Sequence, residues 1–262
     1  MGNPASENVH AISARLHAAP LDELEGLVAR YAEDPRSGVR KAVGVARRRL
    51  ESHAERVAHT RELYARQREY AGAGLVVGID EVGRGAVAGP LTVAAVALPD
   101  EPLIIGLDDS KKLQPSLREE LALEIRRNAI AIGMAHIPPD EIDRDGMSRS
   151  LRRAMLLALE DAGVDPDVVL IDGTPLHICP EEVAVVGGDG LIASIAAASI
   201  VAKVTRDARM RVADGEYPGY HLASSKGYAS PEHIAAIREL GLTPFHRATF
   251  CEGFMSIQDS LF

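Results

Sequence analysis

The chain has 262 residues, of which 46% are hydrophobic, and a formal net charge of −9. It is long enough to bury a substantial core as one large domain, or as one domain with an appendage. Two cysteines without a CxxC pair exclude a disulfide framework, and no apolar stretch is long enough to span a membrane. Because the first ten residues also lack the basic start and apolar run of a signal peptide, we expect a cytoplasmic protein.

Charge is distributed unevenly along the sequence. Residues 1–70 carry 12 basic and 10 acidic side chains, whereas the remainder carries 17 and 28. An acidic body of this kind is unusual for a protein that binds nucleic acid. Such binding would need a local basic surface, or metal ions between the protein and the phosphates.

Residues 20–70 have the spacing of helices that break near Asp34 and Pro35. The second helix is expected from about Val39 to Tyr70, with one modest apolar face. Its basic side chains have two interpretations: they grip nucleic acid, or they keep the helix soluble among acids such as Glu51. These basic residues are Arg40, Lys41, Arg47, Arg48 and Arg49.

The stretch LVVGIDEVGRGAVAGP, residues 75–90, predicts a buried strand that ends in Asp80 and Glu81. Two neighbouring carboxylates repel each other unless a cation lies between them or one of them takes a proton. Such hard oxygen ligands favour Mg²⁺ or Mn²⁺. Neighbouring strand residues face opposite sides, so both acids share a site only if the strand bends or ends there, which Gly83 permits. The alternative is that both acids simply end a strand in solvent.

Glycines after the acids have two further interpretations. Gly83 and Gly85 flank Arg84, so this backbone could approach a phosphodiester closely. The same glycines with Ala88 also fit the dinucleotide pattern G-x-G-x-x-A, which needs a helix to follow. The next residues, LTVAAVAL, have the β-branched composition of a second strand instead.

Next comes a polar loop, GLDDSKKL at residues 106–113, which by its sequence alone is a charged connection. Ser116 and Glu119 form a possible capping box for the helix that follows it. A further helix starts near Ser148 and ends at Gly163.

The segment VVLID at 168–172 then predicts a second buried strand ending in an acid, Asp172. In a sheet shared with the first strand, this acid would lie beside Asp80. The segment could equally be a plain core strand that runs into a turn.

Asp189 lies between glycines just before a helix of small residues, a position that is ordinarily an N-cap. Further along that helix, Ser199, Lys203 and Arg206 are spaced by four and three residues. They should project from one face and form the best local basic surface of the chain.

Many of these segments occur in the order that is typical of one family. GIDEVGRG, GPLTVAAVAL, GLDDSKKL, LIDG, SIAAASIVAKVTRD, YPGY, KGY and PFHRATF together resemble bacterial ribonuclease HII, a type 2 ribonuclease H. The resemblance covers about residues 74–250, and DPRSGVRK resembles the N-terminal extension of the longer members. It implies an α/β fold, a ribonuclease H-like mixed sheet flanked by helices, whose first two strands are antiparallel. We expect a helical extension over residues 1–70 with a partly disordered start, a catalytic domain over 71–250 and a tail over 251–262.

The resemblance also implies an activity. Members of the family hydrolyse the phosphodiester 5′ to a ribonucleotide in RNA–DNA hybrids or in duplex DNA, leaving a 3′-hydroxyl and a 5′-phosphate. Such an enzyme removes misincorporated ribonucleotides in excision repair and primer RNA in DNA replication. Asp80, Glu81, Asp172 and Asp189 would hold two Mn²⁺ or Mg²⁺ ions, about 4 Å apart, in the substrate complex.

Substrate contacts follow from the same resemblance. Ser110 and Lys111 become candidates for phosphate binding, and Tyr228, whose ring would otherwise be ordinary packing, would stack on a sugar and sense the ribonucleotide. His246 and Arg247 either reach the site or are structural. The full set of expected substrate-binding residues is Gly83, Arg84, Gly85, Ser110, Lys111, Ser199, Lys203, Arg206 and Tyr228.

The sequence also departs from the usual family pattern. Lysines are usual where this chain has Gly187 and Leu191, which removes cationic help next to Asp189. A glycine and a histidine are usual where it has His221 and Ser225, so the contacts made by that loop are also expected to differ.

The last five residues resemble the motif by which bacterial replication proteins dock on the sliding clamp, with Gln258, Leu261 and Phe262 as its main residues. Packing of the tail on the catalytic body is the alternative. Two other functional classes also stay open: a hybrid-binding module without catalysis, and a nicotinamide oxidoreductase. The four acids weigh against both.

Overall fold

The computed structural model describes residues 7–255, and the chain forms two compact units, Met1–His59 and Thr60–Phe262. We call them the N-terminal unit and the sheet unit. The clamp-like residues Gln258, Leu261 and Phe262 lie outside the described residues. In the part of the chain that the structure describes, no helix is long and apolar enough to cross a membrane.

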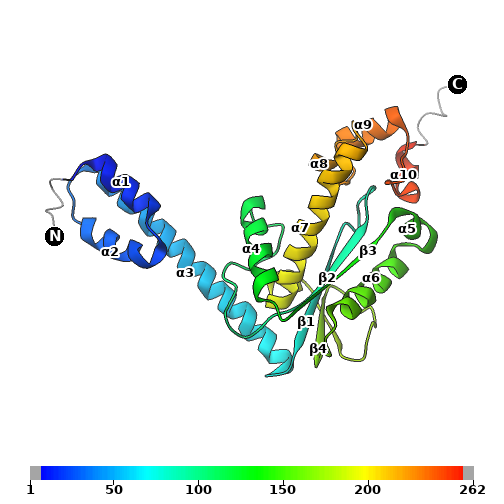
Figure 1. Ribbon diagram of the computed structural model, residues 1–262, viewed down its shortest axis with the longest axis horizontal. Coiled ribbons are helices and arrows are strands. Elements are labelled where there is room, and N and C mark those ends of the chain that lie inside the picture. The colour runs from blue at the N-terminus through cyan, green and yellow to red at the C-terminus, as the bar shows by residue number, and fades with distance from the viewer. Residues whose placement is uncertain (1–6, 256–262) are drawn as a thin grey trace. The chain divides into compact units, whose positions relative to one another are not determined.

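In its described part, the N-terminal unit consists of helices and short connections (Figure 1). The side chain of Asn8 caps the first helix by accepting from the His10 amide, and the predicted break near Asp34 and Pro35 separates the second helix from the third. Val39 and Val43 turn inward with residues of the first two helices such as Leu24. The helices are α1 (Val9–Ala18), α2 (Leu21–Tyr31) and α3 (Ser37–Ala71).

The sheet unit begins inside α3, because the last turns of this helix join the core of that unit. Leu63 and Tyr64 are buried there, and the Thr60 hydroxyl accepts a hydrogen bond from the Gly106 amide at 2.9 Å. The amide side chain of Gln67 accepts from the Ser194 amide at 2.8 Å, at the start of α7 (Ala193–Glu216). The end of α3 thus holds two segments through hydrogen bonds that span 46 and 127 residues of the sequence.

The sheet has the strand order β3-β2-β1-β4-β5. The pairs β1–β2 and β2–β3 are antiparallel, and the pairs β1–β4 and β4–β5 are parallel. This is the mixed sheet with an antiparallel first pair that the sequence predicts. The strands are β1 (Val76–Val82), β2 (Leu91–Ala97), β3 (Ala131–Ile137), β4 (Val168–Asp172) and β5 (Glu182–Val185).

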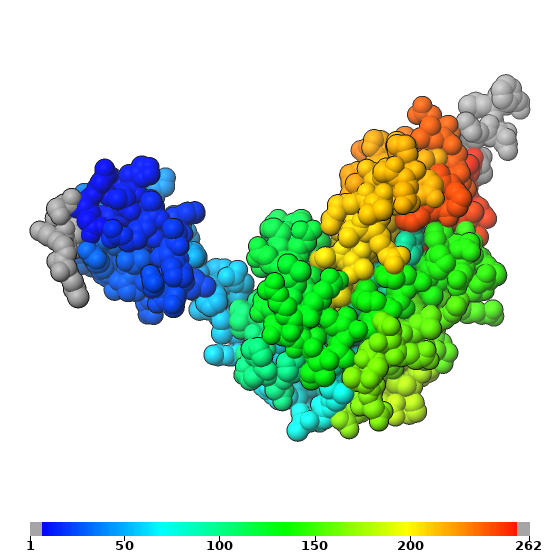
Figure 2. All heavy atoms as spheres, viewed as in Figure 1, coloured from blue at the N-terminus to red at the C-terminus, as the bar shows by residue number. Residues whose placement is uncertain are grey.

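Helices cover both faces of the sheet (Figure 1). α7 and α4 (Pro115–Asn128) cover one face and pack against each other, as the space-filling view also shows (Figure 2). α6 (Met147–Ala162) covers the other face, next to α5 (Pro139–Asp145). The remaining elements are the short 3₁₀ helix η2 (Gly188–Gly190), α8 (Leu222–Ser225), α9 (Pro231–Leu240) and α10 (Ala248–Met255).

Small residues let α7 approach the sheet very closely. Every residue from Ala193 to Ala202 is buried, and the helix crosses β1 at Gly78. A Cβ on Gly78 would lie 2.3 Å from the carbonyl carbon of Ser194 and 2.4 Å from the nitrogen of Ile195, both backbone atoms. This close approach places the first turn of α7 directly against β1.

The strand predicted after the glycines is confirmed as β2, so no helix follows directly on Gly83 and Gly85 as a dinucleotide fingerprint requires. One expectation about local structure is wrong. The capping box of Ser116 and Glu119 does not form, because α4 begins earlier, at Pro115, after an N-cap residue that makes no side-chain bond. The fixed φ of proline at the first helical position starts the helix without that cap.

Candidate functional site

Two acids meet at the carboxyl ends of neighbouring parallel strands. The β1–β4 ladder pairs Ile79 with Ile171, so the next residue on each strand, Asp80 and Asp172, lies beside the other. Both acids have the strand parity of Gly78, so they face α7, where Asp80 is buried. Residues 168–172 are therefore more than a plain core strand that runs into a turn, because this strand ends with Asp172 beside Asp80.

A third acid, Glu81, follows directly on β1, which continues to Val82 without ending at the acids. Its own backbone amide donates to Asp80 Oδ1 at 2.7 Å, and its carboxylate lies 3.7 Å from the Arg84 guanidinium. Glu81 is half-buried rather than in open solvent. The interpretation of two acids at a solvated strand end is therefore wrong for this pair.

η2 brings the fourth acid, Asp189, to the same edge of the sheet. Gly187 has a positive φ of 69°, and the amide of Gly188 donates to Asp172 Oδ1 at 2.7 Å, which ties this turn to the end of β4. Asp189 itself is buried. The N-cap interpretation is wrong, because α7 begins four residues later, after Ile192, and no side chain caps it.

The electrostatics of the site couple these carboxylates. Burial raises the pKa of Asp80 well above its usual value, the negative charge of Glu81 raises it further, and a hydrogen bond from Ser199 opposes both. Burial also raises the pKa of Glu81, where Arg84 opposes the effect and Asp172 adds to it. The pKa of Asp189 is raised by burial, against the influence of Lys111. Asp80, Glu81 and Asp189 are thus costly to ionise where they stand, and a cation among them would lower that cost.

The polar loop before α4 supplies the groups that face these acids. Ser110 is buried, and its hydroxyl lies 2.9 Å from that of Ser199 on α7. The ammonium group of Lys111 lies 3.2 Å from Asp189 Oδ2 and 3.6 Å from Asp109 Oδ1. Asp109 was missed by the sequence reasoning. Its position in the loop could have identified it, because the next two residues, Ser110 and Lys111, were already predicted to bind phosphate.

The predicted basic surface on α7 is wrong at Arg206, which is fully buried. Its guanidinium donates to three backbone oxygens, those of Ala88, Pro90 and Lys226, at 2.7–3.0 Å. Lys203 is paired with Asp207, one turn along the helix, at 2.8 Å. A buried guanidinium is stable only when its donors are used, and here they hold backbone in place.

A second buried arginine, Arg247, holds the same glycine-rich loop. Its guanidinium donates to the Gly89 carbonyl at 2.9 and 3.1 Å and to the Arg84 carbonyl at 3.1 Å. Gly83 makes room for the other arginine, since a Cβ at this position would lie 2.3 Å from Arg206 Nε. The loop from residue 83 to 90 is therefore fixed by two cations that never reach solvent.

Tyr228 stands over one of these arginines. The Arg206 Cζ atom lies 5.5 Å from the centre of the tyrosine ring, and 37% of the Tyr228 surface remains exposed. The Val87 and Ala88 amides both donate to the Gly227 carbonyl, which joins the tyrosine segment to the glycine-rich loop. The structure thus presents an open aromatic ring on the same scaffold as that loop.

His246 is structural rather than part of the acidic site. It is buried, its Nε2 lies 3.2 Å from His233 Nε2, and its Nδ1 lies 2.8 Å from the Thr243 hydroxyl. Burial lowers the pKa of His246 to about 4, and the charge of His233 acts in the same direction. Both rings are therefore neutral near pH 7 and join α9 to the segment before α10.

The donor set at the edge of the sheet suits hard divalent cations, because all four groups are carboxylates. Among the described residues, however, no three acids, histidines or cysteines are already arranged to hold an ion. Lys111 instead places its ammonium group on Asp189 and Asp109. The carboxylates thus fit a metal chemically, and their side chains would have to converge on it.

The family comparisons match nearly the whole chain. The family described as Ribonuclease HII matches residues 77–253, and the Ribonuclease HII N-terminal domain matches residues 8–71. A ribonuclease HII of Listeria monocytogenes is 37% identical over 94% of both chains. One of Enterococcus faecalis is 39% identical over 94% of this chain and 97% of its own.

Solved structures agree with this in fold. The ribonuclease H2 of Pyrococcus horikoshii superimposes with a TM-score of 0.60 at 24% identity, over 69% of this chain and 97% of its own. A ribonuclease HII of Archaeoglobus fulgidus, solved in complex with PCNA, gives 0.59 at 28% identity, over 66% and 93%. A Bst ribonuclease HIII in complex with Mn²⁺ gives 0.57 at 19% identity, over 78% and 74%.

Proposed function

The chain belongs to the ribonuclease HII family, and we propose that it cleaves, with divalent metal, the phosphodiester 5′ to a ribonucleotide. The family assignment makes it a ribonuclease H, a hydrolase that acts on RNA–DNA hybrids. Its substrates would include single ribonucleotides embedded in duplex DNA, and its products would carry 3′-hydroxyl and 5′-phosphate ends. Removal of misincorporated ribonucleotides and of primer RNA would follow from this specificity.

The observation that carries the proposal is the position of four carboxylates, from β1, β4 and η2, at one edge of the sheet. Asp80, Glu81, Asp172 and Asp189 would hold two Mn²⁺ or Mg²⁺ ions. When bound, such ions activate water and stabilise the leaving oxygen of a phosphodiester. The Bst ribonuclease HIII, which shares this fold, was solved in complex with Mn²⁺, which supports a divalent cation at this site.

The chain's own residues would position the substrate. Arg84 and Lys111 are exposed cations next to the acids and suit the phosphates on either side of the cleaved bond. Ser110 would orient Ser199, whose hydroxyl in turn donates to Asp80. The amides of Gly83 and Gly85 would approach the sugar-phosphate strand closely, and Lys203 lies farther along α7.

Tyr228 would recognise the ribonucleotide by stacking on its neighbouring sugar, where the 2′-hydroxyl distinguishes RNA from DNA. Its exposed ring and its support by a buried guanidinium favour this role. Arg206 would act through that ring and through the loop, as a positioning residue rather than as a phosphate ligand.

We also propose that the tail binds the replication sliding clamp through Gln258, Leu261 and Phe262. The Archaeoglobus fulgidus neighbour was solved as a complex with PCNA, which supports the idea of a clamp partner. Deletion of residues 258–262 should abolish affinity for the clamp and leave the cleavage rate in its absence unchanged. Equal clamp affinity of the full and shortened chains would refute this part of the proposal.

The decisive experiment is incubation with a duplex that contains one ribonucleotide, with Mn²⁺, with Mg²⁺ and with chelator, followed by mapping of the ends. Cleavage 5′ to the ribonucleotide should require metal. Asp172→Asn should lower turnover by at least about 1,000-fold, since it removes an anionic ligand. Binding without cleavage at any metal concentration would indicate a hybrid-binding module, and near-normal turnover of Asp172→Asn would remove that residue from the site.

A further inference from the structure

Two buried histidines, His233 and His246, form a continuous chain of hydrogen bonds from Thr243 to the backbone of Tyr228. The Nδ1 atom of His233 lies 2.9 Å from the Tyr228 carbonyl oxygen, and the Nε2 atoms of the two rings lie 3.2 Å apart. The Nδ1 atom of His246 lies 3.1 Å from the Thr243 amide nitrogen. Each of the four ring nitrogens therefore has a partner, as buried polar groups require.

The partners at the two ends of this chain determine the tautomer of each ring. A backbone amide can only donate, so His246 Nδ1 accepts from Thr243 and the proton of this ring is on Nε2. The Thr243 hydroxyl, 2.8 Å from the same Nδ1, is also free to donate, because its oxygen accepts from the Phe245 amide. His246 then donates to Nε2 of His233, whose proton must be on Nδ1. That proton meets the Tyr228 carbonyl, which can only accept, so both ends require the same assignment.

The Tyr228 carbonyl is held by two donors from the start of α9. The Ser230 hydroxyl caps this helix by accepting from the His233 amide at 3.2 Å, which places His233 in its first turn. The Ser230 amide donates to the Tyr228 carbonyl at 2.8 Å, and the His233 ring supplies the second donor. The peptide after Tyr228 cannot rotate without breaking these bonds, and the buried His233 donor would then lack a partner.

We propose that His233 and His246 are positioning residues for ribonucleotide recognition, because their hydrogen bonds fix the backbone of Tyr228 and with it the direction of the exposed ring. The inference rests on the proposed role of Tyr228 in stacking on a sugar. Neither histidine touches the substrate in this arrangement. A ring that must meet a sugar face depends on its support, since a misplacement of about 1 Å can cost about 100-fold in rate.

The first test is the tautomer of each ring in the full chain without substrate. In ¹⁵N NMR spectra of the histidine-labelled protein at about pH 7, His233 should carry its proton on Nδ1 and His246 on Nε2. The single variants His233→Asn and His246→Gln assign these signals among the 9 histidines of the chain. A proton on Nε2 of His233, or on Nδ1 of His246, would break the chain of hydrogen bonds and overturn the inference.

The second test is a matched pair of substitutions at residue 233. The amide nitrogen of asparagine is as many bonds from Cα as Nδ1 of histidine, whereas that of glutamine corresponds to Nε2. His233→Asn therefore keeps a donor for the Tyr228 carbonyl, and His233→Gln loses it. For a duplex with one ribonucleotide, kcat/KM per folded protein should fall about tenfold in His233→Gln and less than about threefold in His233→Asn. Equal losses in the two variants would contradict the proposal.

A double-mutant cycle with Tyr228→Ala separates positioning of the ring from a general structural role. Because His233 acts through the ring, His233→Gln should cost less than about twofold in the Tyr228→Ala background. The same tenfold cost in both backgrounds would refute the inference, since the histidine would then act on something other than Tyr228. The proposed function fails separately, if the unmodified chain does not cleave the duplex with Mn²⁺ present, and the NMR result is independent of that outcome.

Discussion

Gly83→Ala gives a sharp test of how the glycine-rich loop is held. Gly83 has a φ of +88°, and an added Cβ would lie 2.3 Å from Nε, 2.8 Å from Cζ and 2.9 Å from Cδ of Arg206. That side chain is fully buried and bonded to three backbone carbonyls, so it has little room to move. The positive φ costs about 1–3 kcal/mol for alanine, and one lost charge-assisted hydrogen bond costs about 1.5–3 kcal/mol. We expect Gly83→Ala to lower the free energy of unfolding by about 3–5 kcal/mol.

Gly85→Ala is the matched control, two residues away in the same loop. Its added Cβ would meet no atom within 4 Å, so its stability should stay within about 1 kcal/mol of the unmodified chain. Urea unfolding, monitored by circular dichroism, measures the free energy of unfolding of both variants. Replacing Arg206 with alanine should remove the clash, so the cost of Gly83→Ala should be smaller in that background. Equal unfolding midpoints for the two glycine variants would refute the reasoning.

Two further predictions concern packing and pH. Gly78→Ala should lower the free energy of unfolding by about 3 kcal/mol in the same urea assay, because the added Cβ would meet the α7 backbone at Ser194 and neither backbone can move away. A stability equal to that of Gly85→Ala would contradict this prediction. The depressed pKa of His246, about 4 when folded against 6.5 when unfolded, means that the unfolded chain takes the proton first as pH falls. Stability should be full above pH 6.5 and fall by about 3 kcal/mol towards pH 4. His246→Gln should flatten that acid limb in urea titrations, and an unchanged limb would exclude this residue as its cause.

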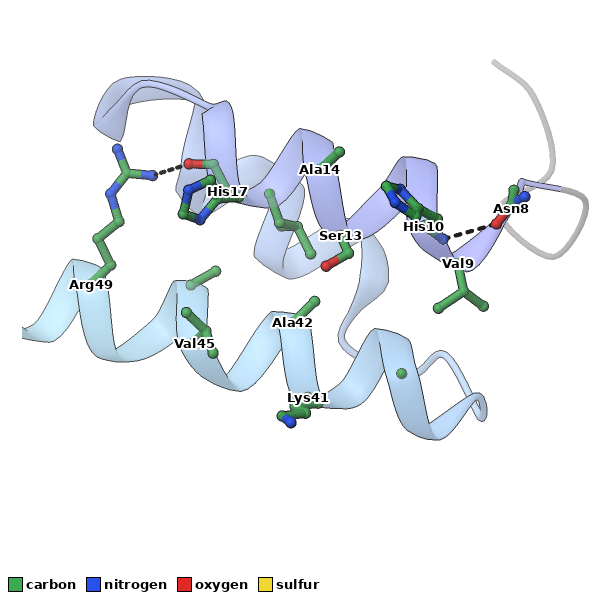
Figure 3. A pocket seen from close by; sticks show the side chains of 13 residues that line it. Asn8, Val9, His10, Ser13, Ala14, His17, Lys41, Ala42, Val45 and Arg49 are labelled. Atoms are coloured by element: carbon green, nitrogen blue, oxygen red, sulfur yellow. Dashed lines mark hydrogen bonds between the residues drawn. The ribbon is translucent and has the colours of Figure 1, made fainter.

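Much of the fold was readable because the buried strands are short, apolar and bounded by acids or glycines. Residues 168–172 form β4 with the bounds that the sequence predicts, and the helix after Ser148 does end at Gly163. The strand β3 was not predicted from the sequence. Its residues, AIGMAHI, alternate between partly buried and buried side chains, and no acidic residue marks the end of the strand. The helix α1, capped by Asn8 (Figure 3), lies where a partly disordered start of the helical extension was expected, because its sequence offers few apolar positions and only Ile12 and Leu16 are buried.

Sequence patterns located the acids of the site more easily than their partners. Asp80 and Asp172 follow from strand ends, because adjacent parallel strands deliver their last residues to one edge. Arg206 was predicted to lie on the surface, but it is buried. Helical spacing shows which residues share a face of the helix, and it does not show whether another segment covers that face. The covering segments, around Ala88 and Lys226, lie 118 residues before it and 20 residues after it. Asp109 was missed for a related reason, since only the fold brings Asp189 to it.

Arg206 and Arg247, the two buried arginines, make the stability of the loop at residues 83–90 depend on a distant part of the chain. The amides of Val87, Ala88 and Gly89 donate to carbonyls of Gly227 and Phe245, so these bonds join the loop to residues 139 or more positions later. Segments joined in this way tend to open together as one cooperative unit. Local unfolding of the C-terminal helices would therefore release the loop while leaving the carboxylates in place on β1, β4 and η2. Substitutions remote from the acids would then lower activity without altering them.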